Sequence, residues 1–124
     1  MAQVVHPEHV PAVYPLPGSI LQEFVGVGAA LPSSHQSIAL FTLTAGTSYP
    51  ESYNRTSDEI YLIHKGRGTV WLGDQPSPVQ AGDIVRISPQ LRHHIAAAKD
   101  CSLSFYAISA PSFTQNDYVP TQSR

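Results

Sequence analysis

The chain has 124 residues, which predicts a single domain spanning 1–124 with a hydrophobic core that needs no disulfide or metal cross-link. It carries 7 Lys and Arg against 9 Asp and Glu, a formal net charge of −2, and no basic run. Neither nucleic acid nor an anionic membrane is therefore an expected partner. Cys101 is the only cysteine, which excludes an intrachain disulfide. No signal-peptide pattern and no apolar run of about 20 residues occurs, so we expect a cytoplasmic location.

The first 18 residues contain four prolines, which exclude a helix or a central strand and predict an extended arm across a sheet face or edge. Further along, the glycine-containing segment 65–68 predicts a hairpin between two short strands. Segment 112–124 carries Pro120 near its end and is expected to be a tail with only partial order. The strands expected from alternating apolar residues and turn signals are 20–27, 37–44, 59–64, 69–72, 83–87, 92–98 and 102–109.

These short strands, separated by frequent turn residues, are accompanied by no convincing helical periodicity. Such a pattern is typical of an all-β sandwich or closed barrel. Alternation along a strand places Tyr61 and Ile63 on the same face as Glu59, and Ile95 and Ala97 on the same face as His93.

Two pairs of residues have a spacing that resembles the double motif of the cupin superfamily. Glu59 and Gly66 are separated by six residues, as in the first motif, which reads Gly, five residues, His-x-His, three or four residues, Glu, six residues, Gly. Gly82 and His93 are spaced as in the second motif, which reads Gly, five residues, Pro-x-Gly, two residues, His, three residues, Asn. The resemblance implies a double-stranded β-helix, or jelly roll, with the site inside the barrel. It also implies a homodimer, since small cupins commonly pair through sheet edges and N-terminal arms.

The chain departs from these motifs at several positions that bind metal in the family. If three residues separate the second histidine from Glu59, the two histidine positions of the first motif are occupied by Tyr53 and Arg55. The resemblance therefore leaves Glu59 and His93 as the two remaining metal-binding residues. The Pro, Gly and Asn of the second motif are replaced by Ser88, Gln90 and Ala97.

Two protein ligands bind a divalent ion weakly, and catalytic zinc sites use three. A guanidinium at Arg55 would repel such an ion by about 8 kcal/mol at roughly 4 Å and an effective dielectric near 20. We therefore expect no metal cofactor. The alternative is a metal-dependent cupin, a dioxygenase or an ectoine-synthase-like cyclase, in which Tyr53, Glu59 and His93 hold iron, zinc, nickel or manganese.

Without a metal, Tyr53, Arg55, Glu59 and His93 predict acid–base catalysis on a small molecule that bears a carbonyl or carboxylate. His93 is suited to general acid or base catalysis, and Arg55 would orient a carboxylate or stabilise an enolate. This chemistry belongs to lyases, isomerases and cyclases. An alternative is that Arg55 and Glu59 form only a structural ion pair.

Two further aromatic residues are candidates for substrate binding. Tyr61 shares the face of Glu59 and can donate a hydrogen bond to a developing oxyanion. Trp71 could form a wall for a flat or apolar ligand, although packing in the core explains it equally well. A third function stays open, in which the barrel binds a small molecule without transforming it.

Overall fold

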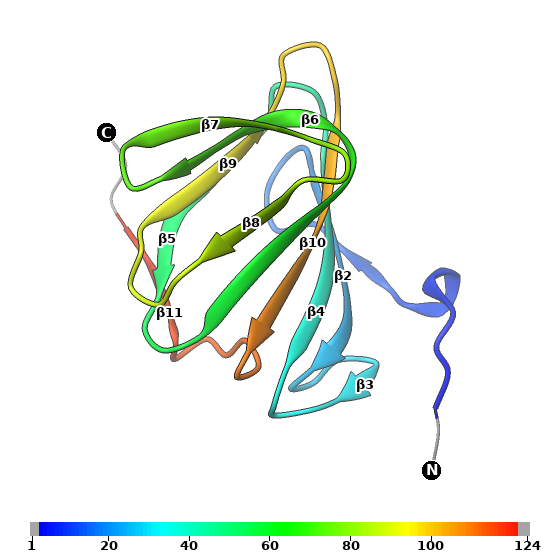
Figure 1. Cartoon of the computed structure of the whole chain (residues 1–124). Helices are drawn as coiled ribbons and strands as arrows, with labels where there is room; N and C mark the ends of the chain where they lie inside the picture. The colour runs from blue at the N-terminus through cyan, green and yellow to red at the C-terminus, as the bar shows by residue number, and fades with distance from the viewer. Residues whose placement is uncertain (1–2, 122–124) are drawn as a thin grey trace.

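The computed structural model describes residues 3–121, and it is nearly all β-structure, as the sequence predicted. A single short 3-10 helix, η1, spans Pro7–His9. Within 3–121 no helix has the length and apolar character to cross a bilayer. The strands are β1 (Ala12–Val13), β2 (Ser19–Gly26), β3 (Leu31–Pro32), β4 (Ser37–Leu43), β5 (Ser48–Asn54), β6 (Asp58–Leu72), β7 (Gln75–Gln80), β8 (Ile84–Ile87), β9 (His93–Ala97), β10 (Leu103–Ala110) and β11 (Tyr118–Pro120) (Figure 1).

The strands form a curled sheet with the order β1-β2-β4-β10-β6-β9-β5-β11, and all pairs are antiparallel except β2 with β3. The long strand β6 holds the fold together, because it belongs to both halves of the sheet. Its first half pairs with β10 and β8, and its second half pairs with β9 and β7. The sheet curls around an interior that both halves line, which is the jelly-roll architecture expected from the motifs (Figure 1).

The predicted hairpin at 65–68 is wrong, because β6 continues through this segment without turning back. The glycines serve a different purpose, which is to let backbones approach closely where the strand passes from one half of the sheet to the other. A Cβ atom on Gly66 would overlap the carbonyl oxygen of Ser102, and one on Gly68 would overlap the carbonyl oxygen of Ala96. Gly66 also has a positive φ of 81°. A glycine inside a strand often marks such a close approach rather than a turn.

Both ends of the chain are attached to the sheet. The arm adds β1 to the edge strand β2, and the side chain of Gln22 donates hydrogen bonds to the carbonyl oxygens of Pro7 and Val10. The prediction of a partly ordered tail is wrong for residues 112–121, because β11 pairs with β5. Residues 122–124 lie outside the described part of the chain.

The hydrophobic core fills one end of the curled sheet. Along the inward face of β10, Leu103 belongs to this core alone and Ser109 lines a cavity. Phe105 and Ala107, between them, belong to the core and also line the cavity. The other large and fully buried side chains are Leu43, Ile63, Val70, Ile87 and Ile95. The inward-facing residues of the same strands thus pack against one another at one end of the barrel and line a cavity at the other.

Candidate functional site

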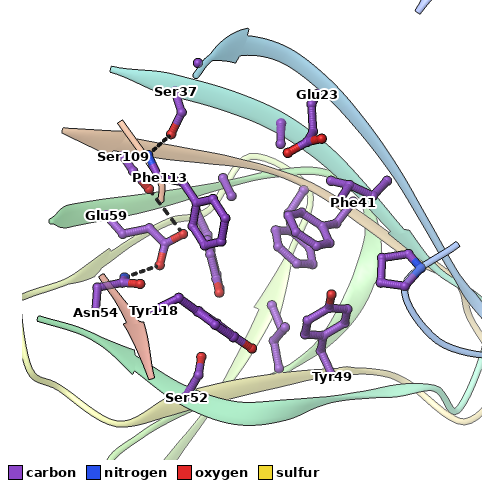
Figure 2. A pocket seen from close by; sticks show the side chains of 18 of the residues that line it. Glu23, Ser37, Phe41, Tyr49, Ser52, Asn54, Glu59, Ser109, Phe113 and Tyr118 are labelled. Atoms are coloured by element: carbon purple, nitrogen blue, oxygen red, sulfur yellow. Dashed lines mark hydrogen bonds between the residues drawn. The ribbon is translucent and has the colours of Figure 1, made fainter. Parts of the chain in front are cut away.

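A cavity of about 430 Å³ occupies the hollow end of the barrel. Its wall comes from strands β2, β4, β5, β6, β9 and β10, together with residues 13–15 of the N-terminal arm and the segment after β10 (Figure 2). The polar and aromatic residues that line it include Glu23, Phe41, Tyr49, Ser52, Asn54, Glu59, Tyr61, His93, Ser109, Phe113 and Tyr118.

Glu59 and His93 meet at the wall of this cavity. The Nε2 atom of His93 lies 3.5 Å from Oε1 of Glu59, and the side chains of His93 and Glu59 are 4% and 12% exposed, respectively. Asn54 donates a hydrogen bond of 2.9 Å from Nδ2 to Oε1 of Glu59, and Ser109 donates one of 3.5 Å to Oε2 (Figure 2). The carboxyl group is therefore buried and held by three neighbours from three different strands.

Burial raises the pKa of Glu59 from 4.5 to about 7, although the hydrogen bonds from Asn54 and Ser109 favour the ionised form. A carboxyl with a pKa near neutrality is close to evenly divided between its acid and base forms, which is the condition that general catalysis requires. Burial also lowers the pKa of His93, and the hydrogen bond to Leu91 offsets only part of this effect. Burial therefore favours the neutral imidazole of His93.

The backbone determines which nitrogen of His93 carries the proton. Nδ1 lies 2.9 Å from the carbonyl oxygen of Leu91, and a carbonyl oxygen can only accept a hydrogen bond. We therefore assign the proton of the neutral ring to Nδ1, which leaves Nε2 as an acceptor directed toward Glu59. The two side chains can then share a single proton between Nε2 and the carboxyl group.

Glu59 and His93 meet in one cavity as predicted, but the prediction that Tyr53 or Arg55 joins them there is wrong. Ser52 and Asn54 of β5 line the cavity, so Tyr53 between them faces away. Arg55 is exposed, and its Nε donates to the carbonyl oxygen of Asn116. The turn after β5 contains one residue more than the prediction assumed, and this single residue exchanges the two faces of the strand.

The first cupin motif allows either three or four residues between its second histidine and its glutamate, and four is the correct number here. Four residues place Ser52 and Asn54 at the positions of the two histidines. Tyr118 and Phe113 had no comparable signal, because they reach the cavity only through the path of the C-terminal segment. That segment is held in place by Asp117, whose carboxylate accepts hydrogen bonds from Thr56 and Ser57.

The donor atoms at this site do not fit the metal centre that the cupin resemblance implies. Ser52 and Asn54 offer a hydroxyl and an amide where the family places imidazoles, and divalent transition metals favour imidazole, thiolate and carboxylate. Within residues 3–121, no group of three or more His, Cys, Asp or Glu residues could hold a metal ion. The alternative site of Tyr53, Glu59 and His93 also lacks its geometry, because Tyr53 faces away from the other two.

The two aromatic candidates have different positions. Tyr61 lines the cavity, and its ring lies edge-on to that of His93 with centroids 6.0 Å apart. Burial and the neighbouring Glu59 raise the pKa of Tyr61 well above its usual value, so the hydroxyl remains a hydrogen-bond donor. The prediction for Trp71 is wrong, because its ring stacks on His94 at 4.4 Å and does not line the cavity. Val70, on the opposite face of β6, belongs to the core.

The raised pKa of Glu59 predicts a pH dependence of stability. The folded carboxyl retains its proton to a higher pH than the unfolded one, so the unfolded chain binds fewer protons between pH 4.5 and about 7. The stability of the wild type relative to Glu59→Gln should therefore fall by about 3 kcal/mol as pH rises through this window. Urea unfolding of both proteins across the pH range measures this difference. A difference that does not vary with pH would contradict the assignment.

Comparison with known proteins defines the class to which this fold and site belong. Residues 39–109, more than half of the chain, match the family described as the cupin domain. The chain belongs to the cupin family.

A protein of Methanocaldococcus jannaschii, described as uncharacterized, is 29% identical over 100 residues, which cover 81% of this chain and 79% of that protein. Among solved structures, the Streptomyces protein Pac13, described as a nucleoside dehydratase, is 17% identical with a TM-score of 0.81, over 98% of this chain and 92% of that one. The polyketide cyclase RemF from Streptomyces resistomycificus is 16% identical with a TM-score of 0.79, over 100% of this chain and 88% of that one. At these identities the structural likenesses show the shared cupin fold.

Proposed function

We propose that this cupin is a small-molecule enzyme of the lyase, isomerase or cyclase type, which moves a proton on a carbonyl-bearing substrate inside the barrel. The observation that carries the proposal is the buried Glu59 carboxyl, with a pKa of about 7, 3.5 Å from the unprotonated Nε2 of His93 at a cavity wall. A buried Glu–His pair that served only to stabilise the fold would not need an open cavity of this size beside it.

The proposed roles follow from the protonation states. Glu59 and His93 exchange a proton with the substrate, one accepting it from carbon while the other supplies it elsewhere. Tyr61 and the side-chain amide of Asn54 donate hydrogen bonds to the oxygen on which negative charge develops. Ser52 and Ser109 complete the polar end of the cavity. Because Arg55 lies outside the cavity, no guanidinium is available to orient a carboxylate. A substrate that bears a carbonyl is therefore favoured over one that bears a carboxylate.

We further propose that this chemistry requires no metal. The donor set supports this, because Ser52 and Asn54 stand at the positions where the cupin motif places histidines. The metal-dependent alternative therefore has less support than it had in the sequence. Several structural neighbours are described as a dehydratase, a cyclase or a lyase, which is consistent with an enzyme.

Proton exchange can test the proposal even though the substrate is unidentified. The protein is incubated in D2O with a panel of uncharged cyclic carbonyl compounds, and proton NMR follows the loss of signal at the carbon beside the carbonyl. We expect catalysed exchange for at least one compound, and we expect it to persist in an excess of EDTA. His93→Ala should lower the rate by about 100-fold or more, because Nε2 is lost.

His64→Ala is the matched control, since the His64 ring contacts Tyr106 and does not line the cavity. Exchange that stops in EDTA and returns with one added metal would replace the metal-free mechanism by a metal-dependent one. A compound that binds in the cavity and shows no exchange would favour a barrel that binds without catalysis.

A further inference from the structure

The wall of the cavity contains carboxylates and no permanent positive charge. Glu23 of β2 and Glu59 of β6 both line it, and within the described residues no lysine or arginine does. Burial lowers the pKa of His93, which favours its neutral imidazole. Arg55 and Arg92 are engaged elsewhere, with the carbonyl oxygen of Asn116 and the carboxylate of Glu51, respectively. An anionic ligand would therefore lose its hydration in this cavity without gaining an ion pair.

The part of the wall away from Glu59 is aromatic. The rings of Phe41 and Phe105 stack with centroids 5.3 Å apart and planes inclined by 4°, and Tyr49 meets Phe41 edge-on at 5.3 Å. On the C-terminal segment, Phe113 and Tyr118 form a second edge-on pair at 5.7 Å. In Figure 2, Glu59 and Asn54 lie on one side of the view and Phe41 and Tyr49 on the other, with Phe113 and Tyr118 between them.

Apart from Glu23, an exposed side chain on the same side of the view as Phe41 (Figure 2), several polar side chains of the cavity gather near Glu59. Asn54 and Ser109 are hydrogen-bonded to its carboxyl group, and Ser52 and Tyr61 line the cavity from β5 and β6, two residues from Asn54 and Glu59 respectively. A ligand with a polar edge and a flat apolar body would match this division, since rings gain most by stacking against aromatic faces. A flexible aliphatic chain would gain less from the same surfaces and would lose more conformational entropy.

We propose that the cavity accepts a planar cyclic molecule without negative charge, which inserts its carbonyl edge toward Glu59 and Asn54 and its ring toward Phe41 and Tyr49. This inference rests on the proposed function, because it specifies the substrate class of the same site. It excludes sugar phosphates, nucleotides and small carboxylic acids, whose charge the cavity does not neutralise.

Two probes of the same shape can isolate the effect of charge. Naphthalene-2-carboxamide and naphthalene-2-carboxylate differ mainly in the charge at one edge, and calorimetric titration at about pH 8 compares their binding to the full chain. We expect the carboxamide to bind at least tenfold more tightly. Equal or tighter binding of the carboxylate would overturn the proposal, and so would the absence of binding by both probes at millimolar concentration.

Two sets of variants locate the effect. Glu23→Lys should raise the affinity for the carboxylate at least threefold relative to Glu23→Gln, because it adds a positive charge to the wall. Phe41→Ala should weaken carboxamide binding at least fivefold, whereas Tyr106→Ala, whose ring contacts His64 and does not line the cavity, should not change it. Unchanged binding in Phe41→Ala would overturn the proposed ring position.

These binding measurements remain separate from the proposed catalysis. If the carboxamide binds preferentially and no carbonyl compound undergoes exchange, the ligand class stands and the enzyme assignment fails. If exchange occurs on an anionic compound, the enzyme assignment stands and the ligand class fails.

Discussion

Glu59→Gln is expected to lower the rate of proton exchange by about 100-fold to 10,000-fold, the usual range for loss of a general acid or base. Glutamine has nearly the same shape and can accept the hydrogen bond from Asn54, so the cavity keeps its form. It cannot take up or release a proton at neutral pH, so the shared proton between Glu59 and His93 disappears. The rate is measured by NMR in D2O under saturating substrate, with circular dichroism to verify the fold.

Asp58→Asn is the matched control, because it makes the same chemical change at the adjacent residue. Asp58 forms an ion pair with Arg86 at 2.9 Å, and the side chains are 44% and 67% exposed, so its loss should cost less than about 1 kcal/mol of stability and leave the rate unchanged. A Glu59→Gln variant with wild-type exchange would remove Glu59 from the mechanism and leave it a structural role only.

Gly66→Ala is expected to destabilise the fold by about 3 kcal/mol, the combined effect of a strained positive φ and of overpacking against a neighbouring backbone. The new methyl group would overlap the carbonyl oxygen of Ser102, and a backbone atom cannot rotate away as a side chain can. Because β6 pairs with four other strands, a shift here would disturb both halves of the sheet. Thermal unfolding should show a midpoint lower by about 10 °C.

Gly73→Ala separates the two contributions. Gly73 also has a positive φ, 62°, but a Cβ atom there would meet no atom within 4 Å. This variant should therefore lose only about 1 kcal/mol, the cost of the backbone conformation. Equal losses in the two variants would mean that the close approach of β6 and Ser102 contributes nothing.

The fold and the central pair of the site could be predicted because their signals are local. Alternation in 37–44 and 102–109 marks strands, and the spacings of Glu59 from Gly66 and of Gly82 from His93 mark the two motifs. Each spacing lies within a short stretch of strand and adjoining turn, so recognising it does not require knowledge of contacts between distant segments. The position of Tyr61 in the cavity followed from the same alternation, two residues after Glu59.

Tyr53 and Arg55 illustrate how this kind of prediction fails. Their orientation depends on the number of residues in the turn that follows β5, and that turn is shaped by Asp117, about sixty residues away along the chain. Trp71 failed for a related reason, since the sequence does not say which face of the second half of β6 is directed inward. The homodimer and the absence of a metal stay predictions.

By themselves, strand periodicity and turn chemistry, which act over only a few residues, predicted an all-β sandwich or barrel. The resemblance of two motif spacings to those of the cupins narrowed this to a jelly roll with one carboxyl and one imidazole inside. The tertiary structure decided which residues surround that pair. Ser52 and Asn54, rather than Tyr53 and Arg55, face Glu59, and the C-terminal segment brings Phe113 and Tyr118 to the cavity. The charge of the site also depends on the tertiary structure. Burial, which raises the pKa of Glu59 to about 7, and the exclusion of every arginine of the described residues from the wall both arise only when distant strands close around a common interior.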